Sequence, residues 1–434
     1  MYARKRLDIG STDLLVGLLA CAGRFDERRE RERVEHALSP PSPGANGEAS
    51  QAIACLSVRS GLDLFLQEIA LPAGSEVLMS ALTIPDMWKI VERHGLVPVP
   101  VDVDPGTLAP TPERWRAAAS PRTRAVIVAH LFGARIPLEP VSKIARERGW
   151  FLLEDCAQSY TGDADKGSPL ADVSMFSFGP IKTATALAGG VLVVRDRAIL
   201  EGMRARQAAQ PEQSRRKYFT RILKYSSLVA LTKRPCYAAF VKMLALLGKD
   251  HDQVIQGTVR GFAGGDFFEK IRHRPNAALL ALLARRLESR STWRVDGRVA
   301  RGEQLVHLLA EASGRISIPG VRAPFHSYWV FTVLVDDPDR VVTELREAGF
   351  DATRAASLRT VPAPEGRADL EPREAQRILA RTVYVPCYPE MPARAVDAMA
   401  RALVQAVRTV PKPAGEVVLT PAPANSGFFP RPRQ

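Results

Sequence analysis

The chain has 434 residues, 46% of them hydrophobic, and a formal net charge of +13. This length predicts a large core divided over two or three domains. The five cysteines form no CxxC pair, so neither a disulfide framework nor a zinc site is predicted. No run approaches the roughly 20 apolar residues of a membrane span. Polar residues interrupt the weak signal-peptide pattern of residues 1–22, and we therefore expect a cytoplasmic protein.

The positive charge is concentrated in one segment. Between Gln213 and Lys249 there are nine lysines or arginines and no acidic residue. We predict no nucleic-acid partner. The amphipathic pattern of 213–249 leaves two interpretations open: a weak peripheral contact with a membrane or a funnel for anions, and a solvated helix face packed against the core or a partner subunit.

The first half of the chain alternates short apolar runs with helical patterns. Residues 1–50 are predicted as an N-terminal helical segment followed by a loop rich in proline and glycine. Continuous runs of Val, Ile and Leu indicate strands that are covered on both faces, and strand–helix repetition predicts a mostly parallel α/β sheet. The expected strands are Ile53–Ser57, Glu76–Ser80, Val97–Val101, Ala125–Ala129, Phe151–Glu154, Ser174–Ser177 and Gly190–Val194.

The second half is predicted to complete a large domain over 51–290 and to form a smaller one. A basic helical insertion is expected at about 205–270. A strand at Tyr328–Val335 and helices at Pro338–Ala348 and Arg394–Val407 indicate a small α+β domain over 291–410. Six prolines in the last 24 residues predict a disordered tail over 411–434.

Lys182 and Asp155 are the main candidates for chemistry. Lys182 lies in an apolar stretch of small residues between two expected strands, where desolvation lowers the pKa of an amine and frees it as a nucleophile. Asp155 ends an apolar strand, and ligands of parallel sheets bind beyond such strand ends. A lysine and a carboxylate are the pair that pyridoxal phosphate (PLP) requires. Asp155 equally fits a helix cap.

Other polar residues are weaker candidates. Gln158 is placed to contact a cofactor ring or its 3-hydroxyl, and Ser177 at a strand end to bind its phosphate. The turn Ser57–Gly61, which includes Arg59 and Ser60, precedes a helix and offers backbone N–H groups to an anion. Each of these also fits an ordinary turn or helix start. His130 is the most site-like histidine, and a structural role fits it equally well.

Several motifs resemble the DegT/DnrJ/StrS family of PLP-dependent sugar aminotransferases. The similarity runs from about Ile53 to Val407, with a poor match near 205–270. The motifs that carry it are Glu154-Asp155-Cys-Ala-Gln158, Phe176-Ser177-Phe-Gly-Pro-Ile-Lys182 and Val385-Pro-Cys-Tyr-Pro-Glu-Met391. The resemblance implies an aspartate-aminotransferase-like large domain (fold-type I), a smaller α+β domain and a homodimer.

The resemblance also assigns roles to the candidate residues. It implies that Lys182 forms the internal aldimine with PLP, that Asp155 binds the ring nitrogen and that Ser177 binds the phosphate. The chain departs from the family at Arg59, where the family has threonine, and over Thr83–Asp86, which lacks the aromatic residue of many members. An Asn-x-Arg segment that the family donates across its dimer interface is replaced by Arg272-His-Arg274.

The function implied by the resemblance is transfer of an amino group, with glutamate as the expected donor, to a keto-sugar, expected in nucleotide-linked form. A cyclitol or another non-sugar ketone is an alternative acceptor. A dehydratase is disfavoured, because that branch of the family replaces the lysine. A non-catalytic regulatory or membrane-surface scaffold of the same fold is the alternative from another class.

Overall fold

A computed structural model describes residues 1–39, 51–162, 165–249, 251–252, 254, 266–289, 292–312, 314–354 and 357–408. The expected proline-rich tail and the expected loop from residue 40 to residue 50 lie outside these residues. Within the described chain, no helix combines the length and apolar character needed to cross a membrane.

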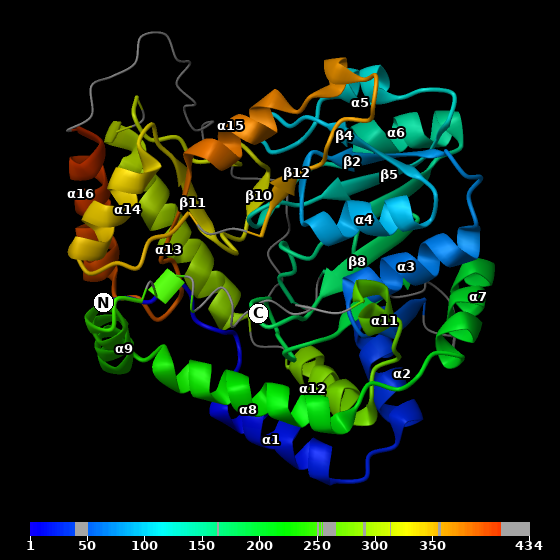
Figure 1. Ribbon diagram of the computed structural model, residues 1–434, viewed down its shortest axis with the longest axis horizontal. Coiled ribbons are helices and arrows are strands. Elements are labelled where there is room, and N and C mark those ends of the chain that lie inside the picture. Colours follow the sequence, from blue (N-terminus) through cyan, green and yellow to red (C-terminus); the bar gives the residue numbers. More distant parts are fainter. Residues whose placement is uncertain are drawn as a thin grey trace, which may run out of the picture.

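A seven-stranded sheet forms the centre of the large domain (Figure 1). All seven strands expected in this region are confirmed, with small shifts at their ends. In sheet order they are β1 (Ala52–Cys55), β9 (Gly190–Val194), β8 (Val173–Ser177), β7 (Phe151–Asp155), β5 (Thr123–Ala129), β2 (Glu76–Ser80) and β4 (Val97–Val101). Only β9 runs antiparallel to its neighbours, so the sheet is mostly parallel, as predicted.

Helices cover both faces of this sheet, because successive strand side chains point to opposite sides. In β1, Ile53 and Cys55 join a core with α3, α4 and α7, while Ala52 and Ala54 join a core with α1, α2, α8 and α12. Helices α5 and α6 pack against strands β2, β4, β5 and β7. The bounds are α1 Ser11–Ala22, α2 Glu27–Leu38, α3 Val58–Ile69, α4 Pro85–Arg93, α5 Pro112–Ala118, α6 Glu139–Arg148, α7 Arg197–Ala208, α8 Arg215–Leu231 and α12 Ala277–Glu288.

A second core lies in the C-terminal part, between the antiparallel strand pair β11–β13 and the helices α13, α14 and α16. Strand β11 is shorter than the expected Tyr328–Val335, because Tyr328 has a left-handed backbone with φ 46° that a strand does not accommodate. The bounds are α13 Trp293–Leu309, β11 Phe331–Leu334, α14 Pro338–Glu347, α15 Arg373–Arg381, β13 Thr382–Val385 and α16 Ala393–Arg408.

Two short strand pairs connect this part to the large domain. Strand β10 (Phe325–His326) pairs with β6 (Ala134–Arg135), and β12 (Arg359–Thr360) pairs with β3 (Leu82–Thr83). The fold is therefore the expected α/β architecture, a mostly parallel large domain with a smaller α+β part. The domain limits given above stay predictions.

The basic segment forms helices, of which α8 packs on the large domain, whereas Tyr237 of α9 (Arg234–Leu246) donates a hydrogen bond to Asp351 of the C-terminal part. Helix α8 lies beside α1 (Figure 1) and buries Tyr218, Ile222 and Tyr225, while α9 and α11 (Phe267–Ile271) follow it. Residues 255–265 of the expected insertion lie outside the described part. The packing of α8 supports the interpretation of this segment as a helix face against the core.

Candidate active site

Lys182 lies in the loop between β8 and β9, at the carboxyl end of the parallel strands. Its backbone N–H donates to the carbonyl of Gly179 over 3.0 Å. A Cβ on Gly179 would lie 3.8 Å from Ser177 Oγ and 4.0 Å from Lys182 Cγ, so both side chains border the same residue. The structure thus brings Ser177 and Lys182 together, as the sequence predicts.

This loop is held in an uncommon conformation by distant segments. Ala184 and Leu187 have φ angles of 51° and 66°, which non-glycine residues rarely adopt. The Ala184 N–H donates to Asp8 Oδ2 over 2.8 Å, and the Tyr218 hydroxyl of α8 donates to the carbonyl of Ala186 over 2.8 Å. Backbone strain of this kind persists where the surroundings fix it, and it is frequent at functional sites.

The surroundings of Lys182 favour its uncharged amine. Burial, aided by the positive charge of Arg59, lowers the pKa of Lys182 to about 8, although Asp155 acts in the opposite direction. The Lys182 Nζ lies 4.1 Å from the centroid of the Trp329 ring, whose Nε1–H donates to the carbonyl of Ile181 over 3.0 Å. An amine with this pKa is a better nucleophile at neutral pH than an exposed lysine.

Asp155 ends β7, and in the described residues a turn, not a helix, follows it. Its Oδ1 accepts the backbone N–H of Ala157 over 2.9 Å, and no other hydrogen bond reaches this carboxylate from the described residues. Burial raises its pKa, and Lys182 is the largest side-chain charge that counteracts this. A partly buried carboxylate with one hydrogen-bond partner is suited to a cationic ligand nitrogen.

Gln158 has its side-chain oxygen already engaged. Oε1 accepts the backbone N–H of Phe132 over 2.9 Å. Only its amide NH₂ remains for a ligand within the described residues, and its contact with a cofactor therefore stays a prediction.

The turn before α3 has the form of an anion site. Ser57 Oγ accepts the N–H of Ser60 over 3.2 Å and lies 3.0 Å from Ser60 Oγ, so Ser57 caps the helix. Arg59 pairs with Asp86 at 2.6 Å. Arg59 and Asp86 both stand where the sequence departs from the family pattern, and their opposite charges neutralise each other.

Glycine is required where this turn meets β9. A Cβ on Gly190 would lie 2.5 Å from the backbone nitrogen of Val58 and 2.6 Å from the carbonyl carbon of Ser57. Real Cβ atoms are not found at such distances. Because Gly190 has no side chain, the N-terminus of α3 can lie directly against β9, the strand that follows the Lys182 loop.

The Gly190→Ala variant is accordingly expected to displace the turn. We expect a loss of about 1–3 kcal/mol in the free energy of unfolding and an increase in the dissociation constant for PLP of at least ~10-fold. Denaturant unfolding and a PLP titration measure both. Gly10→Ala is the control, because its Cβ would meet no atom closer than 3.7 Å; equal effects of the two variants would contradict this explanation.

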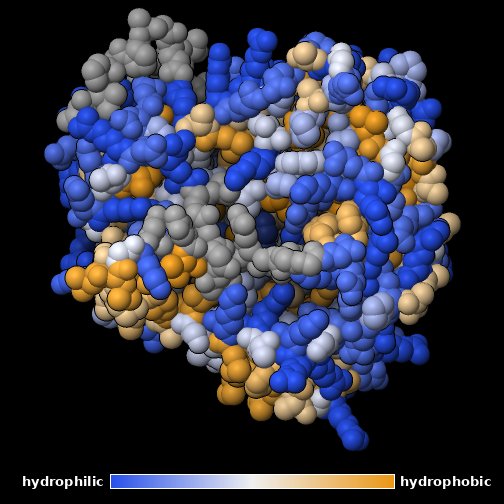
Figure 2. Space-filling model, in the orientation of Figure 1, coloured by the Kyte–Doolittle hydropathy of each residue, from blue (hydrophilic) through white to orange (hydrophobic). Residues whose placement is uncertain are grey.

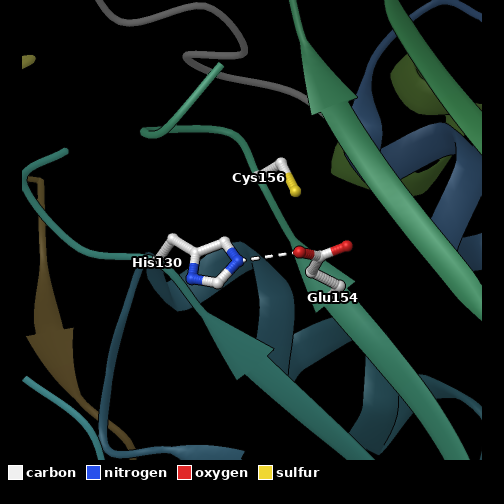
Figure 3. Close-up of side chains that lie close together, drawn as sticks. All are labelled: His130, Glu154 and Cys156. Atoms are coloured by element: carbon white, nitrogen blue, oxygen red, sulfur yellow. Dashed lines mark hydrogen bonds and ion pairs between the residues drawn. The ribbon is translucent and has the colours of Figure 1, made fainter. Parts of the chain in front are cut away.

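His130, Glu154 and Cys156 form a buried cluster (Figure 3), and two of its members are the chain neighbours of Asp155. The N–H of Ile136 donates to His130 Nδ1 over 3.2 Å, so Nε2 carries the proton that is shared with Glu154 Oε1 at 2.9 Å. Burial raises the pKa of the Cys156 thiol well above its usual value. With both imidazole nitrogens occupied, the cluster is a hydrogen-bonded structural unit, and His130 takes the structural role.

The cavity at Lys182 includes residues that the sequence did not single out. It is a small cavity, with a volume of about 20 Å³. The ring of Trp329 lines it, together with the charged residues Lys5, Arg6, Asp8, Lys182, Arg294 and Arg298. Residues 5–8 belong to an N-terminal segment in which the sequence shows only a weak signal-peptide pattern. The sequence around Arg298 and Trp329 contains no motif that indicates this cavity.

Comparisons with known proteins agree with this fold and with the motifs. Residues 45–232 match the model of the DegT/DnrJ/EryC1/StrS aminotransferase family. The L-glutamine:2-deoxy-scyllo-inosose aminotransferase of Streptomyces fradiae is 36% identical over 140 residues, which are 32% of this chain and 33% of that protein. The match thus spans about a third of the length of this curated relative.

Solved structures resemble most of the chain. The aminotransferase TlmJ from Streptoalloteichus hindustanus matches with a TM-score of 0.65 and 20% identity, over 92% of this chain and 97% of that one. The sugar aminotransferase CalS13 from Micromonospora echinospora gives a TM-score of 0.64 and 18% identity, over 93% and 100%. NtdA from Bacillus subtilis, solved with PMP, gives a TM-score of 0.63 and 17% identity, over 92% and 83%.

Proposed function

We propose, from the confirmed resemblance to the DegT/DnrJ/StrS aminotransferase family, that this chain is a PLP-dependent aminotransferase. The observation that carries the proposal is Lys182, an amine whose pKa is lowered to about 8 in a cavity at the carboxyl ends of the parallel strands. Asp155, the last residue of β7, interacts electrostatically with it. These two features favour an enzyme over a non-catalytic scaffold, because strongly shifted pKa values are concentrated at catalytic sites.

The residues present fit PLP. Lys182 would hold its aldehyde carbon, Asp155 would face its ring nitrogen, and Ser177 with the Ser57–Gly61 turn would hold its phosphate. Arg59, which is paired with Asp86, would border that phosphate. PLP supplies an electron sink for the carbon that gains or loses the amino group. Lys182, once displaced by the donor amine, would carry the proton to and from that carbon.

The lowered pKa of Lys182 predicts how PLP capture depends on pH. Only the neutral amine attacks the aldehyde, and its fraction rises as pH passes through the pKa. We expect the capture rate of the apoprotein to rise through a midpoint at about pH 8 and to level off at higher pH. Stopped-flow absorbance from pH 6.5 to 10.5 would show this midpoint, and a midpoint near 10.4, that of a free lysine amine, would contradict the account.

The acceptor is proposed to be a keto-sugar, and a nucleotide-linked one fits the cationic lining of the cavity. A cyclitol ketone is the second candidate, favoured by the relative that acts on 2-deoxy-scyllo-inosose. The test is to convert the purified enzyme to its amino form with L-glutamate or L-glutamine and then to add a panel of keto-sugars and keto-cyclitols. Restoration of the PLP spectrum by one class identifies the acceptor; restoration by neither contradicts both assignments.

Residues 213–249 support a weak membrane contact as a further proposal. Leu223 of α8 and Met243 and Leu246 of α9 are exposed, and Figure 2 shows hydrophobic residues gathered over α9. Exposed apolar groups within a segment that has nine basic and no acidic residues fit anionic lipid. Co-sedimentation with phosphatidylserine vesicles that fades with salt would support it.

We also propose that the protein forms a homodimer and is located in the cytoplasm.

A further inference from the structure

Helix α1 exposes an apolar face that no described residue covers. Leu15 and Leu19, which lie one turn apart, are 57% and 60% exposed. Asp13, the only charged residue of the helix, pairs with Arg285 and Arg286 of α12. A helix at a protein surface normally exposes charged and polar residues, and a helix that is hydrophobic all round is normally buried. The outer face of α1 therefore lacks an apolar partner within the described chain.

The inner side of α1 is already packed against two helices. A Cβ on Gly17 would lie 3.0 Å from Leu282 Cδ2 of α12 and 3.1 Å from Ile222 Cδ1 of α8, so α1 lies close to both. At the end of α1, the Arg215 guanidinium of α8 donates to the carbonyl of Gly23 over 3.1 Å. These contacts fix the rotation of α1 about its axis, and its two exposed leucines therefore stay on the surface.

The exposed apolar side chains continue over the neighbouring helices α8 and α9. Ten large hydrophobic side chains of the described residues are exposed, and eight of them lie within residues 15–25 and 219–247. Figure 2 shows hydrophobic residues at the lower edge of the molecule, where Figure 1 places α1 and α8, and to the left over α9. The eight are Leu15, Leu19, Phe25, Phe219, Leu223, Met243, Leu246 and Leu247.

Basic residues alternate with the apolar ones along α8 and α9. Residues 213–249 contain nine lysines or arginines and no acidic residue. Seven of the nine are exposed, Lys217 and Lys224 of α8 among them, and none of the seven forms an ion pair with a described residue. We refer to these seven cations and the eight apolar side chains as the docking face.

The combination of charge and apolar surface determines which partner fits the docking face. A bilayer with anionic headgroups offers phosphate and carboxylate to the cations and an acyl boundary to the leucines. A second copy of the chain would place one basic surface against another, which like-charge repulsion opposes. A nucleic acid would neutralise the cations but leave the apolar side chains in water. Anionic lipid therefore complements both properties of the face.

We propose that the docking face lies on an anionic lipid bilayer, with Leu15 and Leu19 inserted into its interfacial layer. This inference rests on the membrane contact proposed for residues 213–249 and deepens it. The basic segment supplies the electrostatic attraction, and α1, which lies outside that segment, supplies the apolar insertion. With 12 residues, α1 is shorter than the roughly 20 residues of a membrane span, so it lies in the plane of the surface.

Vesicle flotation of the full-length, PLP-loaded protein tests this assignment. The vesicles contain phosphatidylserine and phosphatidylcholine, or phosphatidylcholine alone, and the wild type should bind only the first kind, less strongly as salt rises. The leucine variant, Leu15→Gln with Leu19→Gln, is expected to lower the partition coefficient at least ~10-fold. The lysine variant, Lys217→Glu with Lys224→Glu, should lower it by a similar factor of at least ~10.

A matched control changes the same net charge on the far side of the molecule. Lys143→Glu with Arg148→Glu reverses two exposed cations of α6, which lies far from α1 and α9 in Figure 1. This variant should bind vesicles as the wild type does. Equal losses in this control and in the lysine variant would show that net charge alone drives binding, which contradicts a specific face.

A tryptophan at position 19 reports insertion directly. Leu19→Trp should keep vesicle binding, because tryptophan is favoured at the membrane interface. Brominated phosphatidylcholine in the phosphatidylserine vesicles should quench the fluorescence that this variant adds to that of the wild type. Lys143→Trp adds the same fluorophore to α6, and its added fluorescence should not be quenched. Equal quenching of the two variants would contradict the insertion of α1.

Folding and catalysis are measured separately. The substituted side chains are exposed, so thermal unfolding and the donor half-reaction without vesicles should be those of the wild type. A protein that binds vesicles but reacts with no amino donor would refute the proposed aminotransferase and leave the docking face intact. A protein that reacts with a donor but binds no phosphatidylserine vesicles at low salt would refute the docking face alone.

Two further results would overturn the assignment. Wild-type binding by the leucine variant, together with lost binding by the lysine variant, would confine the contact to residues 213–249 and exclude α1. A leucine variant that is monomeric by light scattering, where the wild type is a dimer, would assign the face to a second copy of the chain.

Discussion

Lys182→Ala is expected to lower the rate of the donor half-reaction by at least ~10³-fold. The variant lacks the amine that would hold PLP and also the base that would move the proton at the reacting carbon. Its PLP spectrum should lack the long-wavelength band of the wild type. Single-turnover absorbance with saturating L-glutamate measures the rate.

The variant should still fold, because the Lys182 amine makes no hydrogen bond to the described residues and its side chain contacts mainly the Trp329 ring. Lys143→Ala, which removes an exposed lysine of α6, is the control and should react as the wild type does. A half-reaction of Lys182→Ala within ~10-fold of the wild type would refute the assigned role.

Asp155→Asn is expected to slow the same half-reaction by about 10²–10³-fold, the usual effect of removing one preorganised electrostatic group. The amide keeps the shape and the acceptor oxygen for the Ala157 N–H but cannot balance a positive charge on the cofactor ring nitrogen. The apoprotein should be as stable as the wild type or more so, because the variant removes a partly buried carboxylate whose pKa is raised and that has one hydrogen-bond partner. Thermal unfolding and single-turnover kinetics measure the two effects.

Glu154→Gln is the matched control for Asp155→Asn, because it changes the neighbouring carboxylate in the same way. Burial alone would raise the pKa of Glu154, but hydrogen bonds from His130, Ser174 and the Ser168 N–H lower it to about 2. This variant should lose about 1–3 kcal/mol of stability and retain most of its half-reaction rate. The opposite pattern, a slow but stable Glu154→Gln, would contradict the distinction between the two carboxylates.

The strands and the carboxyl ends of the sheet could be predicted from the sequence because they depend on local pattern. Runs such as Val97–Val101 carry the burial signal in themselves, and β2, β4 and β9 lie at the expected residues. The pair Asp155 and Lys182 was also accessible, since each follows a strand and parallel strands end at one edge of the sheet. The left-handed backbone of Tyr328 could not be predicted, because this conformation has no counterpart in the hydropathy pattern.

The rest of the cavity could not be predicted because it depends on contacts between distant residues. Lys5 and Lys182 are far apart in the chain and meet at Trp329. Tyr218 of α8 holds the Lys182 loop through one hydroxyl; the poor family match expected from residue 205 on was wrong at this residue, since the match extends to residue 232. No periodicity or motif marks such residues, since their roles come from where the chain places them and not from their neighbours in sequence.

The most direct test of the account is to identify the lysine that binds PLP. Two amines, those of Lys182 and Lys5, lie beside the same Trp329 ring, so a spectrum alone does not distinguish them. Borohydride reduction of the PLP-loaded protein fixes the cofactor to its lysine, and peptide mass spectrometry locates it. The account predicts the label on Lys182 in the wild type and in Lys5→Met. A label on Lys5, or the absence of any label, would contradict it.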